Sequence, residues 1–384
     1  MFNPSTITIE RSAYASNLSF IKAHLNGARM CSVVKGNAYG HGLKAFVPMA
    51  MEAGVDYFGV YSADEAHALL RSVEDRPDVF VMGMVDDDAL DWAVEQGVEC
   101  CIQDLARLER ALVAASRTGR PARMHIEIET GMHRTGFTSK EIPQVISLLR
   151  EHASEVELVG LFTHFAGAES SVNDDRVGAQ IARYASARGR FERSGLIPRY
   201  AHQACSAAAM NFPGTIGNMA RIGIMQYGFW PNPETWLRYS LLHDTPVDPL
   251  RRTISWKSAV MALTDVPVGG MIGYGTSCEA LRDMCVAVVP VGYAHGFDRG
   301  LSNTGRVLIR GQIARVTGIV NMNAISVDVT DIEGVEKGDE VVLIGHQEEQ
   351  SISVASFSEL SEQLNYGMLT RLPSDIPRLV IDRT

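Results

Sequence analysis

One pattern repeats between residues 29 and 230 and limits the possible folds more than any other feature. Each repeat has a short apolar run, a polar loop and a segment with helical spacing of apolar residues. Strands that alternate with helices pair in parallel through right-handed crossover connections. The apolar runs are RMCSVV, YFGVY, VFVMG, ECCIQ, MHIEIET, LVGLFTHF, YAHQACS and MARIGIMQYG.

The segments between these runs have the periodicity of amphipathic helices. Apolar residues from Ile142 to Leu149 recur at i, i+3, i+4 and i+7, and a similar stripe extends from Leu105 to Leu112. Gly97 and Gly195 follow two such segments, as glycines that end helices do. Eight units in about 200 residues favour a (β/α)8 TIM-type barrel. An open doubly wound sheet is the alternative, but no GxGxxG motif opens a helix after the first strand.

Beyond about residue 240 the pattern changes to β-prone runs bounded by glycine and polar turns. With 384 residues, the chain is long enough for two domains. We expect a barrel over residues 10–240 and a mainly β domain over residues 241–384, which a lone N-terminal strand in residues 1–9 could join. The β-prone runs are ISWKSAVMALTDV, MCVAVVPVGY, GRVLIRGQIARVTGIV, AISVDVTDI and GDEVVLIG, with little helix expected before SVASFSELSEQL.

Composition excludes several classes of protein. The net charge of -10 is spread along the chain without a basic stripe, which argues against a nucleic-acid partner. Six cysteines show neither a CxxC pair nor zinc spacing, so we expect reduced thiols and no metal site. No signal-peptide pattern and no run of membrane-spanning length occurs, which predicts a cytoplasmic protein without a membrane partner.

Chemically active residues stand at the ends of the predicted strands, where the loops of a barrel converge on its active site. They are Lys35, Glu129–Arg134, His164, Ser206 and, in the loop leading into the last strand, Arg221. Any one of them alone is more often a solvated loop residue, but together they predict a site. Lys35 could form a Schiff base, because desolvation lowers the pKa of an amine. Pyridoxal 5'-phosphate (PLP) would be the carbonyl partner, with its phosphate on the small residues of CSAAA and RIGI.

The segment VVKGNAYGHG around Lys35 resembles the PLP-lysine motif of the alanine racemase family, which are fold-type III PLP enzymes. The resemblance extends over essentially the whole chain. It implies a PLP-binding barrel, a β domain and a homodimer in which each active site takes residues from the partner's β domain. Further family-like blocks, in family order, are HIEIETGMHRTGF, LFTHFAGAES, HQACSAAAM, NMARIGIMQYG, IGYGT, VPVGYAHGFDR, NMNAISVDVTDI, GDEVVLIG and LNYGMLTR.

The resemblance implies a role for each matching residue. Lys35 would hold PLP and act with Tyr274, from the partner subunit, as the two acid/base groups that interconvert L- and D-alanine. Two groups suffice, because racemisation removes a proton from one face of Cα and returns it to the other. The residues that would bind the phosphate are Tyr39, Ser206, Gly223, Ile224 and Tyr366.

The remaining implied roles concern the ring of PLP and the substrate. Arg221 would face the pyridine nitrogen, with His164 close by, and its positive charge would keep that nitrogen unprotonated. Weaker electron withdrawal by the ring should then suppress transamination. The residues on the substrate side would be Arg134 near the carboxylate, Met322 through its backbone amide, and Tyr293 at the entrance.

The sequence departs from the family pattern at several positions. Glu127 stands where the family usually has a lysine, commonly carbamylated. We expect Glu127 to orient Arg134 directly, so that activity needs no bicarbonate. On the substrate side, Cys205 replaces asparagine, Asn323 replaces aspartate and Ile319 replaces arginine. A racemase of another amino acid, such as serine, lysine or arginine, is therefore the main alternative.

Two other PLP proteins are further alternatives. A PLP-dependent amino-acid decarboxylase shares the two-domain plan, but such enzymes hold the pyridine nitrogen with an acidic residue, whereas NMARIG supplies Arg221. A non-enzymatic PLP-binding homeostasis protein shares the barrel and its lysine, but such proteins lack the second domain and the tyrosine of IGYG.

Overall fold

The computed structural model describes residues 4–354 and 365–382. The chain divides into two compact units. The barrel unit comprises residues 12–36 and 47–252, and the β unit comprises residues 1–11, 37–46 and 253–384. The domain boundary expected near residue 241 stays a prediction.

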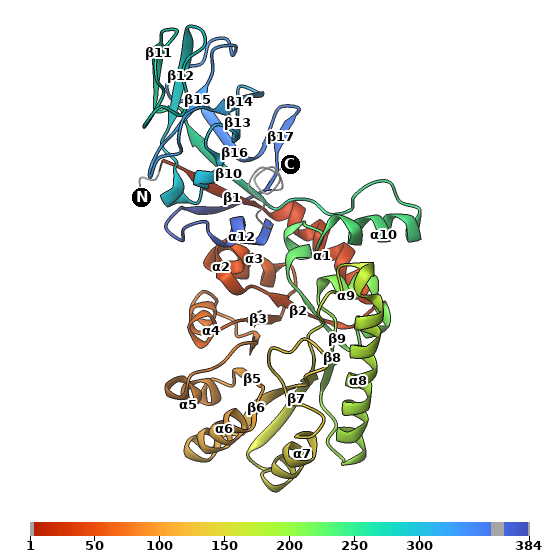
Figure 1. Ribbon diagram of the computed structural model, residues 1–384. Helices are drawn as coiled ribbons and strands as arrows, with labels where there is room; N and C mark the ends of the chain where they lie inside the picture. The colour runs from red at the N-terminus through yellow and green to blue at the C-terminus, as the bar shows by residue number, and fades with distance from the viewer. Residues whose placement is uncertain (1–3, 355–364, 383–384) are drawn as a thin grey trace. The chain divides into compact units, whose positions relative to one another are not determined.

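The sheet of the barrel unit has eight strands and confirms the predicted fold class (Figure 1). Each predicted apolar run overlaps one strand, and the order β8-β7-β6-β5-β4-β3-β2-β9 is parallel throughout. The two ends meet at a bridge between Cys205 and Arg221, where the Arg221 amide donates to the Ala204 carbonyl at 3.0 Å. The strands are β2 (Arg29–Val33), β3 (Tyr57–Val60), β4 (Asp78–Val81), β5 (Glu99–Ile102), β6 (Ala122–Glu127), β7 (Val156–Phe162), β8 (Tyr200–His202) and β9 (Met219–Ile222).

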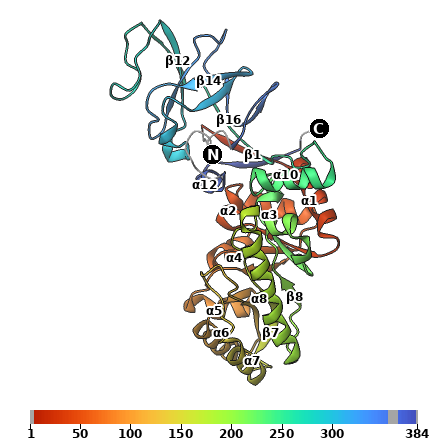
Figure 2. The same ribbon diagram turned by 45° about the vertical axis from the view of Figure 1, so that its right-hand side comes forward.

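Helices alternate with these strands, and α4 to α8 lie on the outside of the sheet (Figure 2). They are α1 (Arg11–Leu25), α3 (Leu43–Glu52), α4 (Ala63–Leu70), α5 (Asp87–Glu95), α6 (Leu105–Thr118), α7 (Ile142–Glu151), α8 (Asp174–Arg193), α9 (Ser206–Asn211) and α10 (Pro233–His243). The predicted stripes on α6 and α7 are confirmed, because their apolar residues are largely buried. Among the described residues, no helix combines the length and apolar character needed to cross a membrane.

The β unit contains a ten-stranded sheet in the order β11-β12-β15-β14-β13-β16-β10-β1-β18, with β17 paired to β16. The N-terminal strand β1 joins it, antiparallel to β10 and parallel to β18. A short helix, α12 (Asn365–Thr370), precedes β18, and the helix expected at SVASFSELSEQL lies almost wholly outside the described residues. The strands are β1 (Thr6–Glu10), β10 (Ile254–Ala259), β11 (Ala262–Val266), β12 (Met284–Val289), β13 (Arg306–Ile309), β14 (Gln312–Val316), β15 (Ile325–Asp328), β16 (Glu340–Gln347), β17 (Gln350–Ile352) and β18 (Arg378–Ile381).

Candidate active site

Lys35 begins a helical turn that winds in the left-handed sense. Strand β2 ends at Val33, and the turn α2 (Lys35–Tyr39) follows. The φ angle is positive at every residue from Gly36 to Gly40, with values from 51° to 79°. Left-handed helical backbone costs roughly 1–2 kcal/mol for each L-residue. Strain of this kind persists only where surrounding contacts enforce it, and it is concentrated at functional sites.

Glu65, on α4, holds the start of this turn. Its carboxylate accepts the backbone amide of Gly36 and the backbone amide of Tyr61, each at 2.7 Å. One side chain therefore fixes the chain directly after Lys35 and the loop that follows β3. No sequence motif points to Glu65, because its contacts depend on the conformation of the loops after β2 and β3.

The far end of the turn is held within the β unit. Arg378 donates to the Gly40 carbonyl at 3.0 and 3.3 Å through two nitrogens. A Cβ atom on Gly40 would lie 1.8 Å from the Leu369 carbonyl oxygen, so only glycine fits against α12. Tyr39, which is half-buried, directly precedes Gly40 in the chain. Gly40 packs against α12, the helix that carries Tyr366. The side chain of Tyr366 lies outside the described residues.

The amine of Lys35 is poised to be a nucleophile. Burial, and next the charge of Arg134, lower its pKa from the usual value, so more of the amine is unprotonated at a given pH. The Nζ atom lies 5.9 Å from the centre of the Tyr61 ring. Within the described part of the chain, no carboxylate forms an ion pair with this amine.

Arg221 lies on β9 (Met219–Ile222), not in the loop before this strand as the sequence predicts, and it is a buried, immobilised cation. Only 4% of its surface is exposed. Its guanidinium donates to the carbonyls of Thr163, His202 and Gln203 at 2.8, 3.0 and 3.1 Å. It also donates to Nδ1 of His202 at 2.6 Å. No carboxylate among the described residues pairs with it directly.

His164 follows β7 and lies within reach of the same charges. Burial, followed by the positive charges of Arg221, Arg134 and Lys35, lowers the pKa of His164 to about 3. The imidazole is therefore neutral at physiological pH. The structure thus brings Lys35, Arg134, His164 and Arg221 together at the carboxyl ends of the barrel strands.

Ser206 and Gly223 connect the loops after β8 and β9. The Ser206 hydroxyl accepts the Gly223 amide at 3.0 Å, and the side chain of Ser206 is buried. Ile224, also buried, begins the short 3-10 helix Ile224–Tyr227. Three of the residues predicted to bind phosphate, Ser206, Gly223 and Ile224, therefore share one local structure.

Glu127, at the end of β6, differs from the expectation that it orients Arg134 directly. Within the described residues, neither a hydrogen bond nor an ion pair joins the two. The carboxylate instead accepts a hydrogen bond from Thr135, and the Cys101 thiol lies 3.9 Å from it. Burial raises the pKa of Glu127, while Thr135 and the charge of Arg134 oppose that rise. Arg134 itself is exposed.

Tyr274, Tyr293 and Met322 lie on neighbouring loops of the β unit. The amide of Tyr293 donates to the Asn321 carbonyl at 3.0 Å, and the amide of Ala294 donates to the Met322 carbonyl at 2.9 Å. The exposed fractions of Tyr274, Met322 and Tyr293 are 72%, 56% and 41%. All three side chains are therefore presented outward from the β unit.

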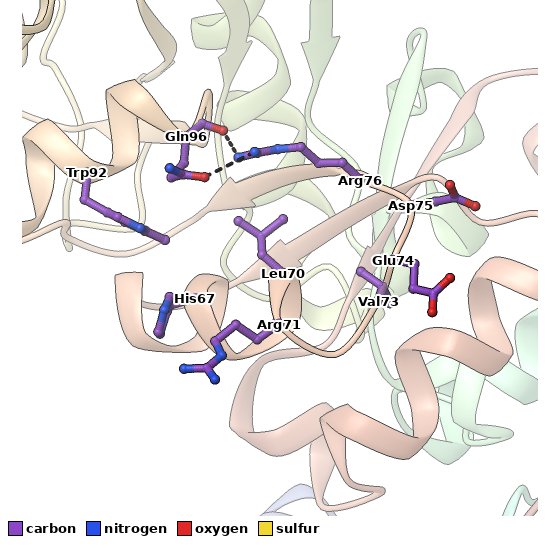
Figure 3. Close-up of a pocket in the computed structure, with 9 residues that line it drawn as sticks. All are labelled: His67, Leu70, Arg71, Val73, Glu74, Asp75, Arg76, Trp92 and Gln96. Atoms are coloured by element: carbon purple, nitrogen blue, oxygen red, sulfur yellow. Dashed lines mark hydrogen bonds between the residues drawn. The ribbon is translucent and has the colours of Figure 1, made fainter.

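A separate groove of about 470 Å³ lies between α4 and α5 (Figure 3). His67 and Trp92 meet there edge to face with ring centres 5.6 Å apart, and Arg76 donates to the Gln96 side chain at 3.2 Å. The loop that lines this groove leads into the amino-terminal end of β4. The amino-terminal ends of the strands form the face of a barrel opposite to its active site. None of the predicted site residues lines it.

Comparison with known proteins agrees with this geometry. The alanine racemase N-terminal domain matches residues 9–231, and the alanine racemase C-terminal domain matches residues 253–380. An alanine racemase of Leptospira interrogans is 32% identical over 98% of this chain and 96% of its own length.

Solved structures give the same result. The alanine racemase from Bacillus anthracis with bound L-Ala-P is 28% identical, has a TM-score of 0.90, and matches 99% of this chain and 96% of its own. The alanine racemase from Bartonella henselae with covalently bound pyridoxal phosphate is 23% identical, with a TM-score of 0.84 over 99% of this chain and all of its own, and shares the fold. The chain belongs to the alanine racemase family.

Proposed function

We propose that this protein is a PLP-dependent racemase that interconverts L- and D-alanine, with Lys35 and Tyr274 as its two acid/base groups. The observation that carries the proposal is the amine of Lys35. Lys35 is the first residue of a left-handed turn. The pKa of its amine is lowered, and the buried guanidinium of Arg221 lies near it. The family membership of the whole chain supports the choice of alanine.

The residues around Lys35 fit PLP. They supply a partly desolvated primary amine for the carbonyl carbon, a fixed cation, and a buried hydroxyl with small residues for the phosphate. When bound, PLP withdraws electrons and so acidifies the Cα–H bond of an attached amino acid. Ser206, Gly223, Ile224, Tyr39 and Tyr366 would bind the phosphate group.

Arg221 would face the pyridine nitrogen and oppose its protonation, because like charges repel in a buried site. Its donors to Thr163, His202 and Gln203 hold it in place, so it cannot turn away from that nitrogen. A ring kept neutral withdraws electrons less strongly. The enzyme would thereby favour return of the proton to Cα over transamination.

Proton transfer needs one group on each face of Cα. Lys35 would serve one face, and its lowered pKa makes the neutral amine available as a base. Tyr274 would serve the other face from the partner subunit of a homodimer, which its 72% exposure supports. His164, held neutral by its surroundings, would accept or donate a hydrogen bond beside Tyr274.

The substrate carboxylate would lie between Arg134 and the backbone amide of Met322, with Tyr293 at the entrance. The exposed guanidinium of Arg134 is free to adapt to a carboxylate. A racemase of another amino acid is the second candidate, because Cys205, Ile319 and Asn323 depart from the family pattern on this side. We also propose a cytoplasmic location, which the six free cysteines support.

The test is a screen of purified protein against L-alanine, L-serine, L-lysine and L-arginine by chiral chromatography. We expect D-alanine to form fastest, and Lys35→Ala protein should form none. Faster turnover of serine or a basic amino acid would favour the second candidate. Racemisation of none of the four would contradict the proposed function.

A further inference from the structure

A row of buried polar groups extends from Arg221 through the interior of the barrel. It passes from β9 to His202 on β8, then to His125 on β6 and Glu99 on β5. The side chains of His202, His125 and Glu99 are completely buried. Burying three such groups is costly unless each is hydrogen-bonded, so their arrangement calls for an explanation.

The hydrogen-bond partners determine where each proton lies. A guanidinium only donates, so Nδ1 of His202, 2.6 Å from Arg221, must accept. The proton of His202 is then on Nε2, which lies 2.8 Å from Nδ1 of His125. His125 in turn carries its proton on Nε2, 2.8 Å from the Glu99 carboxylate. Arg221, which only donates, and the ionised Glu99 carboxylate, which only accepts, thus select the same tautomer for both histidines from opposite ends of the row.

The charges agree with this assignment. Burial lowers the pKa of both His202 and His125, and the charge of Arg221 adds to the effect, so both rings are neutral. Burial opposes ionisation of Glu99, but the hydrogen bond from His125 and the charge of Arg123 prevail and lower its pKa. The row therefore has a cation at one end and an anion at the other. Hydrogen bonds that all point the same way polarise and strengthen one another.

Packing holds both rings in this arrangement. Phe80 stacks on His125 with ring centres 4.0 Å apart, and Phe162 stacks on His202 at 5.1 Å. A Cβ atom at Gly160 would lie 2.0 Å from Nδ1 of His125, the atom that accepts from His202. Glycine at this position therefore leaves room for the link between the two histidines.

The far end of the row is fixed as well. Arg123 lies 2.6 Å from the second carboxylate oxygen of Glu99, and the Tyr57 hydroxyl donates to the first. Arg123 also forms ion pairs with Asp78 at 3.1 Å and with Glu157 at 3.4 Å. Glu99 therefore cannot rotate away from His125.

We propose that Glu99, acting through His125 and His202, is a positioning residue for Arg221. It keeps the lone pair of His202 Nδ1 directed at the guanidinium and supplies the counter-charge that Arg221 lacks among its direct contacts. Arg221 is thereby held in one orientation toward the site. This inference rests on the proposed function, because it assigns Arg221 a role toward PLP.

The first experiment measures the tautomers directly in the wild-type holoenzyme. Nitrogen-15 NMR of histidine-labelled protein, with signals assigned from His125→Asn and His202→Asn variants, reports which ring nitrogen carries the proton. We expect both rings to be protonated on Nε2 at neutral pH. Protonation of His202 on Nδ1 would overturn the proposal. This readout does not depend on which amino acid is turned over, so failure of the proposed function leaves it interpretable.

The second experiment compares Glu99→Gln with Glu157→Gln, since both remove one carboxylate that contacts Arg123. In the Glu99 variant we expect the tautomers of His125 and His202 to become mixed. We also expect kcat to fall roughly ten- to a hundred-fold with little change in KM, since a charge-assisted hydrogen bond is lost. The Glu157 variant should match wild type in both readouts.

Wild-type tautomers together with wild-type kcat in Glu99→Gln would overturn the proposal. If that variant does not fold, Tyr57→Phe removes the second hydrogen bond to the same carboxylate oxygen. We expect it to shift the tautomers and kcat in the same direction, by less. No change in either quantity would also overturn the proposal.

Discussion

The proposed active-site residues of the two units differ in how their side chains are held. In the barrel unit, Arg221 and Ser206 are 4% and 6% exposed and make hydrogen bonds within the unit. In the β unit, Tyr274 is 72% exposed and Met322 is 56% exposed. Arg221 and Ser206 are therefore held within the barrel unit, while Tyr274 and Met322 are presented outward from the β unit.

The difference follows from the architecture of each unit. A closed barrel brings the ends of its parallel strands to one rim, so side chains there pack against one another. The loop of Tyr274 is closed by a backbone hydrogen bond from Ile272 to Cys278 at 2.9 Å, which fixes the backbone and leaves the side chain outward. Variants at the buried Arg221 and Ser206 should therefore alter stability as well as activity, whereas variants at Tyr274 should alter activity alone.

Lys35→Ala should have the largest effect on activity. Losing both the cofactor attachment and one acid/base group should lower kcat by roughly a thousand-fold or more. The visible absorbance of lysine-bound PLP should disappear with it. Lys44→Ala, which removes an exposed lysine nine residues away, is the control and should keep both. Retention of the absorbance in Lys35→Ala would show that another lysine binds PLP.

Tyr274→Phe should lower kcat by roughly a hundred-fold or more, because one proton-transfer group is lost. Its free energy of unfolding should stay within about 0.5 kcal/mol of wild type, because the side chain is exposed. Activity assays and urea unfolding of the same preparation check both quantities. A large loss of stability would mean that Tyr274 is structural, and the contrast between the two units would then fail.

Arg221→Gln tests the barrel side of the contrast. It leaves the carbonyls of Thr163, His202 and Gln203 short of donors, so the free energy of unfolding should fall by about 3 kcal/mol or more. Residual enzyme should lose more PLP to transamination in each turnover than wild type. Arg188→Gln, which removes an exposed arginine on α8, should change stability by less than about 0.5 kcal/mol. Equal stability of the two variants would contradict the assignment.

Glu127→Gln should have the smallest effect. Loss of the anion near Arg134 should lower kcat by roughly two- to five-fold, the range of a weak charge interaction. Activity should be the same with and without bicarbonate. An unchanged kcat would mean that Glu127 has no role toward Arg134.

The pH dependence of stability gives Glu127 a second test. Because burial raises its pKa in the folded state, ionised Glu127 destabilises the protein at neutral pH. Glu127→Gln should be the more stable protein there. That gain should fade as the pH falls through the raised pKa toward 4.5, the usual value for glutamate. A gain that persists below that pH would contradict the assignment.

Most of the fold could be predicted from the sequence, because apolar periodicity reports burial directly. Each of the eight barrel runs overlaps a strand, and STITIE joins the β unit as β1. Lys35 and His164 lie just after barrel strands, as their positions in the sequence predict, whereas Arg221 lies within β9 and not in the loop before it. The roles of all three toward PLP stay predictions. The sequence could not decide whether Glu127 contacts Arg134, because the contact depends on which of two adjacent residues, Arg134 or Thr135, turns toward the carboxylate.

The features that the sequence did not reveal depend on three-dimensional contacts. Glycines at 36 and 40 indicated a turn after Lys35, but not a left-handed one held by Glu65. His125, His202 and Glu99 are separated by many residues and appear in sequence as isolated polar residues in apolar runs. Only the pairing of the barrel strands brings them into line behind Arg221.

The most direct test of the central claim, an active site shared between two subunits, mixes two inactive variants. Lys35→Ala and Tyr274→Phe chains, unfolded and refolded together, form hybrid dimers that contain one site with both residues intact. We predict recovery of about a quarter of wild-type racemisation, because half of the dimers are hybrids and each has one of two sites. Activity no higher than that of the separate variants, with hybrid dimers shown to form, would contradict the account.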